Sequence, residues 1–264
     1  MEHRRRLRET FETVADRYAA ARPAYPEALF DDLVDLAQLR PGAKLLEIGC
    51  GPGIATRPLA ERGYEIHAIE LGAGMTAAAR RALAAYPNVT VEQGAFEDWT
   101  PPPGMAFDLV YAATAWHWID PEIAYERAAA RLRGGAALAF WSADHALPAD
   151  ADPFFEEIQH VYDELGEHHP GPLPPPPPEA APTQEDAIER SGWFNLVGVR
   201  RYVWERRYTA DEYVALLDTF SGHRSMPEAS RAHLYREIRR RLATRPDRSV
   251  RRHWLAILHV ARAV

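Results

Sequence analysis

The chain has 264 residues, 47% of them hydrophobic and 26% charged, and a formal net charge of −7. This composition is that of a globular protein, and it excludes a disordered, collagen-like or fibrous chain. The acidic balance disfavours a nucleic-acid partner, and no apolar run approaches the ~20 residues of a membrane helix, so we expect neither a nucleic acid nor a membrane as partner. Cys50 is the single cysteine and cannot form an intramolecular disulfide, which favours a cytoplasmic location.

Two helices are predicted at the start of the chain. Leu7 to Ala21 and Pro26 to Gln38 place apolar residues at helical spacing, and the second stretch has proline at its first position. The segment Arg22 to Pro26 holds two prolines and separates the two helices. We therefore assign residues 1–40 to an amino-terminal helical cap.

Strands and helices then alternate. Strands are predicted at Lys44–Ile48, Glu65–Glu70, Val89–Gln93, Phe107–Ala112 and Ala136–Trp141. One helix is predicted to end near Arg62, and two further helices are predicted over Ala73–Tyr86 and Pro121–Leu132. This alternation is typical of an α/β fold with a mostly parallel sheet and helices on both faces. Residues 41–145 are assigned to this Rossmann-like core, within a chain that we expect to form a single domain.

The pattern changes after residue 145. Residues 146–192 are predicted to be an insertion, with helices at Pro153–Leu165 and Gln184–Ser191 joined by a proline-rich connector over residues 170–182. Residues 193–264 are predicted to hold the last two strands, Leu196–Tyr208 and Trp254–Val260. Helices from Thr209 to Phe220 and from Pro227 to Leu242 separate them, which indicates a helical lid inserted between the strands.

The loop after the first predicted strand carries most of the functional information. Gly49, Gly51 and Gly53 let the backbone lie close beneath a ligand, because no Cβ intervenes. A dinucleotide fingerprint needs glycine at the sixth position, where this chain has Ile54. The carboxylate of Glu47 would repel a pyrophosphate but would attract an ammonium and a sulfonium. The loop therefore favours S-adenosylmethionine over NAD.

Glu70 ends the second predicted strand. A carboxylate at this place can accept hydrogen bonds from both ribose hydroxyls, and it disfavours a 2′-phosphate. NAD sites and S-adenosylmethionine sites share this role. Glu70 therefore supports a nucleoside ligand without deciding between the two.

These motifs resemble those of a known family. Leu45–Gly53 resembles motif I of the class I S-adenosylmethionine-dependent methyltransferases, and Ala68–Leu71 resembles their motif II. Gly94–Trp99 lies where that family has its adenine-binding loop. Phe107–Val110 followed by Trp116–Trp118 is similar to the small-molecule subgroup that includes trans-aconitate methyltransferase, as are Phe11, Tyr18, Arg22-Pro23 and Tyr25-Pro26 in the amino-terminal segment that covers the cofactor.

The resemblance implies a seven-stranded, mostly parallel sheet and methyl transfer from S-adenosylmethionine to a small molecule, leaving S-adenosylhomocysteine. The cofactor-binding residues that it implies are Glu47, Gly49, Gly51, Gly53, Glu70, Leu71, Phe96, Glu97 and Tyr18. Ala95 departs from the family, because many members carry aspartate there. Adenine would then be held by backbone groups around Phe96.

Four residues are candidates for the acceptor side. His117 is the candidate catalytic base, and its alternative is a histidine packed between Trp116 and Trp118. The two tryptophans could form an aromatic wall near the sulfonium, or could belong to the core. Arg22 shares a helix face with Tyr18 and could reach an acceptor carboxylate, or could be a surface residue.

Two rival functions remain open. One is a NAD-dependent oxidoreductase, and the other is a catalytically silent cofactor-binding homologue that acts through partners held by the proline-rich tract. His168 and His169 lack further ligands nearby, so we predict no metal site. A carboxylate acceptor would need no base, whereas a hydroxyl or amine acceptor would benefit from one.

Overall fold

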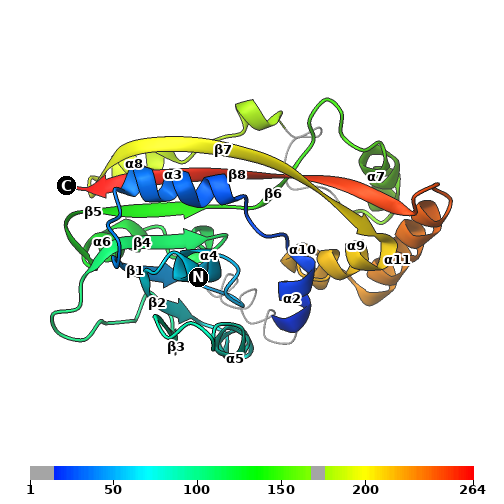
Figure 1. Cartoon of the computed structure of the whole chain (residues 1–264). Coiled ribbons are helices and arrows are strands. Elements are labelled where there is room, and N and C mark those ends of the chain that lie inside the picture. The colour runs from blue at the N-terminus through cyan, green and yellow to red at the C-terminus, as the bar shows by residue number, and fades with distance from the viewer. Residues whose placement is uncertain (1–14, 168–175) are drawn as a thin grey trace.

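The computed structural model describes residues 15–167 and 176–264 (Figure 1). Of the helix predicted over Leu7–Ala21, this range contains α2 (Ala15–Ala21). The rest of that helix, the pair His168 and His169, and the beginning of the proline-rich tract lie outside the described residues.

Within the described residues, eight strands form one sheet in the order β3-β2-β1-β4-β5-β8-β6, with β7 paired to β8. The strands are β1 (Lys44–Ile48), β2 (Glu65–Glu70), β3 (Val89–Gln93), β4 (Phe107–Ala113), β5 (Leu132–Trp141), β6 (Asp144–Ala146), β7 (Phe194–Thr209) and β8 (Ser249–Ala263). Strands β1 to β5 are parallel to one another, and β8 runs antiparallel to its three partners. The predicted mostly parallel α/β fold is confirmed, and β6 is a short strand beyond the seven expected.

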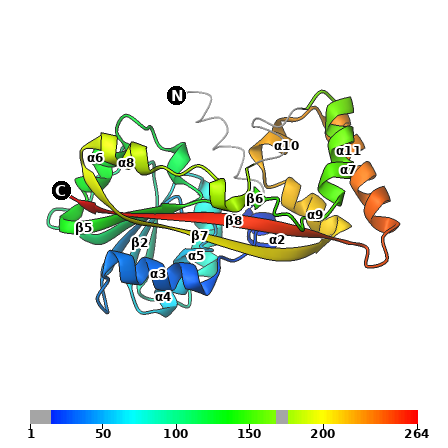
Figure 2. The same cartoon turned by 90° about the horizontal axis from the view of Figure 1, so that it is seen from above.

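Helices cover both faces of the parallel strands (Figures 1 and 2). One face carries α3 (Glu27–Ala37), α4 (Thr56–Glu61) and α5 (Ala73–Ala82), and the other carries α6 (Ala124–Ala129) and α8 (Glu185–Ser191). Side chains alternate between the faces of a strand, so Leu45 joins the core under α3 whereas Leu46 joins the core under α6.

A second group of helices packs at the far end of the β7–β8 ribbon (Figure 1). It consists of α7 (Phe154–Glu164), α9 (Ala210–Leu217), α10 (Ser221–Ser225) and α11 (Glu228–Ala243), which we call the helical insertion. Thr209 begins α9 with a capping box, because its side chain accepts from the Glu212 backbone while the Glu212 carboxylate accepts from the Thr209 backbone. The insertion has a hydrophobic core of its own, which also contacts α2.

Three predicted boundaries were wrong. The helix expected over Pro121–Leu132 ends at Ala129, because Leu132 already pairs with Phe107 in β5. The helix expected to reach Tyr86 ends at Ala82. The last strand is longer than predicted, since β8 pairs with β7 from Ser249 onward although arginines and histidines interrupt its apolar pattern.

Candidate functional site

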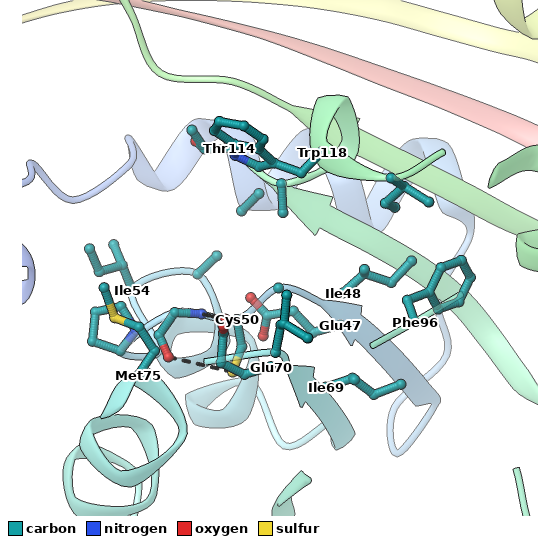
Figure 3. A pocket seen from close by; sticks show the side chains of 18 of the residues that line it. Glu47, Ile48, Cys50, Ile54, Ile69, Glu70, Met75, Phe96, Thr114 and Trp118 are labelled. Carbon is teal, nitrogen blue, oxygen red and sulfur yellow. Dashed lines mark hydrogen bonds between the residues drawn. The ribbon is translucent and has the colours of Figure 1, made fainter. Parts of the chain in front are cut away.

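A cleft with about 980 Å³ of empty space opens at the carboxyl ends of β1, β2 and β4 (Figure 3). Part of this space is open to solvent, and the carboxyl edge of a parallel sheet is where small-molecule sites form. Of the predicted site residues, nine line the cleft: Tyr18, Glu47, Gly49, Gly51, Glu70, Leu71, Phe96, Glu97 and Trp118. The structure thus brings together residues from α2, three strand ends and the loops that follow them.

The glycine loop needs glycine for different reasons at its three positions. Gly49 has φ +66°, and a Cβ there would lie 2.7 Å from the Cβ of Ala115. Gly51 has φ +54°, and a Cβ there would meet nothing within 4 Å, because its Cα borders open space of the cleft. A Cβ on Gly53 would lie 2.9 Å from Leu83 instead, so Gly53 permits helix packing and does not line the cleft as predicted.

Glu47 is fully buried at the base of the cleft. Its Oε2 accepts hydrogen bonds from Thr56 Oγ1 at 2.6 Å and from the Tyr111 hydroxyl at 2.7 Å. Its Oε1 is also buried, and it has no hydrogen-bond partner among the described residues. Burial raises the pKa of Glu47 to about 7, although both hydrogen bonds favour the charged form. A buried carboxylate with one unpartnered oxygen fits a cationic ligand.

Glu70, at the end of β2, stabilises the glycine loop by hydrogen bonds. Its Oε2 accepts from the Gly51 backbone N–H at 2.8 Å, and its Oε1 accepts from the Gly72 backbone N–H at 2.9 Å. A carboxylate has about four acceptor positions, so both oxygens can also accept from hydroxyl groups of a ligand. Glu70 therefore links the conformation of the loop to the ligand that the loop surrounds.

The amino-terminal segment closes one side of the cleft through Tyr18 and Tyr25. The Tyr25 hydroxyl is 2.8 Å from Thr114 Oγ1, and Thr114 follows β4 with φ +56°, a strained conformation for a β-branched residue. Desolvation raises the pKa of Tyr25, so its phenol stays neutral. Sequence analysis did not assign either residue to the site, although Tyr25 lies in the segment that resembles the family and Thr114 follows a strand at the active edge.

Apolar side chains form the remaining walls. Ile69, Leu71 and Phe96 lie on the side of β2 and the loop after β3, while Trp118 and Ile119 lie on the side of β4. Figure 3 shows Trp118 and Thr114 across the cleft from Glu47 and Glu70. A flat, apolar group could therefore lie between these walls, with the two carboxylates on the opposite side.

His117 and Trp116 do not line the cleft. Both belong to the turn η2 (Trp116–Trp118). The His117 side chain is exposed and its ring packs 4.8 Å from that of Trp118, whereas Trp116 stacks on Phe140 at 5.1 Å within the core under α6. The aromatic wall predicted for both tryptophans is therefore formed by Trp118 alone.

Arg22 also lies outside the walls of the cleft. Its Nε donates to Thr219 Oγ1 at 2.9 Å, and its Nη2 donates to the Thr219 carbonyl at 3.3 Å. The half-buried side chain thus connects the end of α2 to the helical insertion. Sequence analysis placed Arg22 on the face of Tyr18, and the two are in cation–π contact at 4.9 Å.

Part of the chain is similar to known methyltransferases. Residues 45–135 match the model of a methyltransferase domain. An uncharacterized methyltransferase of Mycobacterium tuberculosis is 33% identical over 135 residues, which cover 51% of this chain and 52% of that protein. A trans-aconitate 2-methyltransferase of Delftia acidovorans is 36% identical over 120 residues, 44% of this chain and 42% of that protein. The chain thus matches about half the length of these relatives.

Similarity to solved structures extends over more of the chain. A structure from Anaeromyxobacter dehalogenans, assigned to the type II methyltransferases, has a TM-score of 0.63 and 26% identity, covering 91% of this chain and 97% of that one. Among the described helices, none has the length and apolar character needed to cross a membrane. With its sheet order and the domain matched over residues 45–135, the chain is similar to the class I S-adenosylmethionine-dependent methyltransferases.

Proposed function

We propose that the chain binds S-adenosylmethionine in the cleft and transfers its methyl group to a small-molecule acceptor. The observation that carries the proposal is the buried Glu47, whose Oε1 has no partner among the described residues at the base of the cleft. An ammonium group would satisfy this oxygen and return the pKa of Glu47 toward its ordinary value. A pyrophosphate would be repelled by it, which disfavours NAD.

The proposed roles follow from position. Bound S-adenosylmethionine supplies a methyl group activated by its sulfonium. Glu47 pairs with the ammonium, and Glu70 accepts hydrogen bonds from the ribose hydroxyls while it holds Gly51 in place. Leu71 and Phe96 contact adenine, and Tyr18 and Tyr25 exclude water from the other side of the cleft. Glu97, near Phe96, and Gly49 complete the contact surface.

We further propose that the acceptor is a carboxylate that becomes O-methylated. A carboxylate is deprotonated at neutral pH and needs only placement and desolvation, and this fits a cleft whose wall does not include His117. One relative is named for its action on trans-aconitate, a carboxylic acid. In this proposal, the amino-terminal cap and the helical insertion act as a lid over the acceptor.

The proposal places the reaction in the cytoplasm, with no nucleic acid as partner. Cys50 is the only cysteine and is buried beside the glycine loop, where burial raises its pKa well above the usual range. The net charge of −7 would repel a nucleic-acid backbone. Cell fractionation with an antibody against the chain would test the location.

Calorimetric titration with S-adenosylhomocysteine and with NAD tests the cofactor. We expect S-adenosylhomocysteine to bind and NAD not to bind. Glu70→Ala should weaken S-adenosylhomocysteine about tenfold to a hundredfold, because it removes charge-assisted hydrogen bonds worth roughly 1.5–3 kcal/mol each and solvent replaces part of them. Glu65→Ala is the matched control, since Glu65 lies on the same strand but is exposed and paired with Lys44. Binding of NAD alone would overturn the assignment.

A second measurement separates an enzyme from a silent homologue. Methyl transfer from labelled S-adenosylmethionine is followed with a panel of organic acids, phenols and amines. Turnover of an acid supports the proposed reaction. Tight cofactor binding with no transfer across the panel would favour a binding homologue that acts through partners.

A further inference from the structure

β7 forms an outer edge of the sheet, at the top of the view in Figure 1. It pairs with β8 from Phe194 to Thr209, and no other described strand pairs with it. A long edge strand presents a row of unpaired backbone N–H and C=O groups, and sheet proteins normally shorten, cover or charge such an edge. With 16 residues, β7 is the longest of the described strands, so its edge is a candidate interaction surface.

Exposed apolar side chains gather along the same strand. Five large apolar side chains of the described residues are exposed, and three of them, Trp193, Val197 and Val203, lie on β7 or directly before it. Val203 is 47% exposed, although it stands opposite Leu255 of β8, which is buried. A further strand that covered Val203 would remove apolar surface from water.

The charges on either side of Val203 have opposite signs. Arg201 lies two residues before it and Glu205 two residues after it, so the three side chains share one face of the strand. Arg201 donates to the Ala181 carbonyl at 3.1 Å, and it forms no ion pair with a described residue. Glu205 is 49% exposed, and its ion pairs within the chain use Oε2, which leaves Oε1 as an acceptor.

We propose that β7 is the interface of a symmetric dimer, in which the β7 strands of two copies of the chain pair antiparallel about Val203. A twofold axis at Val203 sets the two valines against each other, and it sets Arg201 of each copy against Glu205 of the other. An axis at Arg201 or at Glu205 would bring like charges together instead. The charges therefore select this register, and the sheet continues from one copy into the other.

The opposite face of β7 limits the strength of this pairing. In the same register, the half-buried Tyr202 stands opposite Trp204 of the second copy, which is a favourable aromatic pair. Arg200 stands opposite Arg206 of the second copy, and their like charges oppose association. We therefore expect a dimer that dissociates on dilution.

Sedimentation equilibrium of the full chain tests the dimer. The average mass should rise with concentration from that of one chain to that of two. Val203→Lys places two like charges at the axis and should weaken the association at least about tenfold. Met105→Lys is the matched control, because Met105 is also exposed and apolar but lies before β4, away from β7. The control should associate like the unmodified chain, and circular dichroism should show both variants folded.

Oxidative cross-linking tests the register. Directly paired residues of antiparallel strands have Cα atoms about 4.5–5.5 Å apart, a distance that a disulfide can span. Val203→Cys should therefore form a covalent dimer. Arg207→Cys is the matched control: it lies four residues from the axis, about 26 Å from its copy, and should not cross-link. Both variants retain Cys50, which is buried.

Exchanging the charges separates a specific pairing from unspecific association. The Arg201→Glu variant carries only acidic side chains at the two paired positions, and the Glu205→Arg variant carries only basic ones. Each variant alone should therefore associate more weakly than the unmodified chain. A mixture of the two should form mixed dimers, because each charge then meets its opposite.

A chain that stays monomeric up to its solubility limit would overturn the proposal. Unchanged association of Val203→Lys, equal cross-linking of the two cysteine variants, or a charge-exchange mixture without mixed dimers would also overturn it. If the chain were monomeric while the β7 amide protons were protected from hydrogen exchange along the outer edge, a segment of the same chain would cover that edge, and the proposal would be wrong.

Discussion

The parallel core and the helical insertion build their sites in different ways. In the core, the proposed ligand contacts lie at strand ends and in the loops that follow them, from Glu47 to Ile119. In the helical insertion, the contacts join residues far apart in the chain, such as Arg22 with Thr219 and Asp152 with Arg245. A site of the first kind leaves a local motif in the sequence, and a site of the second kind does not.

Both regions bury charged side chains. The core buries the carboxylate of Glu47 at the base of the cleft, and β8 buries the guanidinium of Arg252 against Phe220 and Trp254 beside the helical insertion. Each buried charge has an unpartnered atom among the described residues. We expect changes in the core to alter cofactor binding and changes in the helical insertion to alter stability, and the following variants test that division.

The largest expected effect is that of Gly51→Val. Its side chain would enter the open space of the cleft, and φ +54° is unfavourable for valine, so binding of S-adenosylhomocysteine should fall below detection in calorimetry. Gly63→Val is the matched control: Gly63 has φ +83° and open space around its Cβ, but it ends α4 outside the cleft. Undiminished affinity in Gly51→Val would contradict the site.

A smaller effect is expected for Glu47→Gln, which should weaken S-adenosylhomocysteine about tenfold to a hundredfold by removing a charged partner of the ammonium. In the unmodified protein the carboxylate is the binding form. With a pKa of about 7, affinity should therefore fall as the pH drops through 7, by about tenfold for each unit below it. Titrations at pH 8 and pH 6 should show this fall in the unmodified chain but not in Glu47→Gln.

The same group makes a prediction about stability without ligand. The folded pKa of Glu47 is raised above its ordinary value of 4.5, so the folded state binds more protons between pH 4.5 and 7. Its contribution is therefore fully present below pH 4.5 and is lost as the pH rises through 7. If the Tm of Glu47→Gln depended on pH in the same way as the Tm of the unmodified protein, the pKa of Glu47 would not be raised in the folded state.

Leu234→Ala should affect stability but not the cofactor. Leu234 is fully buried in α11 within the core of the helical insertion, and such a truncation costs about 2–5 kcal/mol. We expect a lower Tm in thermal unfolding, with the Kd of S-adenosylhomocysteine within twofold at temperatures where the variant is folded. A parallel loss of cofactor affinity would mean that the two regions are not separable.

His117→Ala should have the smallest effect. If the acceptor is a carboxylate, kcat should change less than about threefold, and the pH–rate profile should be unchanged near the ordinary histidine pKa of about 6.5. His160→Ala, at another exposed histidine, serves as the control. A loss on the order of 10²–10⁴-fold confined to His117→Ala would indicate a hydroxyl or amine acceptor with His117 as base.

Sequence analysis predicted the core well because its strand-ending motifs are local. Glu47, Gly51 and Glu70 could be placed together since parallel strands end at one edge of the sheet. Thr114 could not be found, because its positive φ and its contact with Tyr25 depend on how the cap packs. The burial of Arg252 could not be predicted for a similar reason, because in the sequence it is one of two adjacent arginines and only the fold buries it.

A structure determined with S-adenosylhomocysteine bound would test the central claim most directly. We predict that the amino group of the ligand lies within hydrogen-bond distance, about 3 Å, of Glu47 Oε1 and that both ribose hydroxyls contact Glu70. Adenine should then lie against Leu71 and Phe96. A ligand bound outside the cleft, or one whose ribose faces Glu47 and leaves Glu70 without contact, would contradict the account.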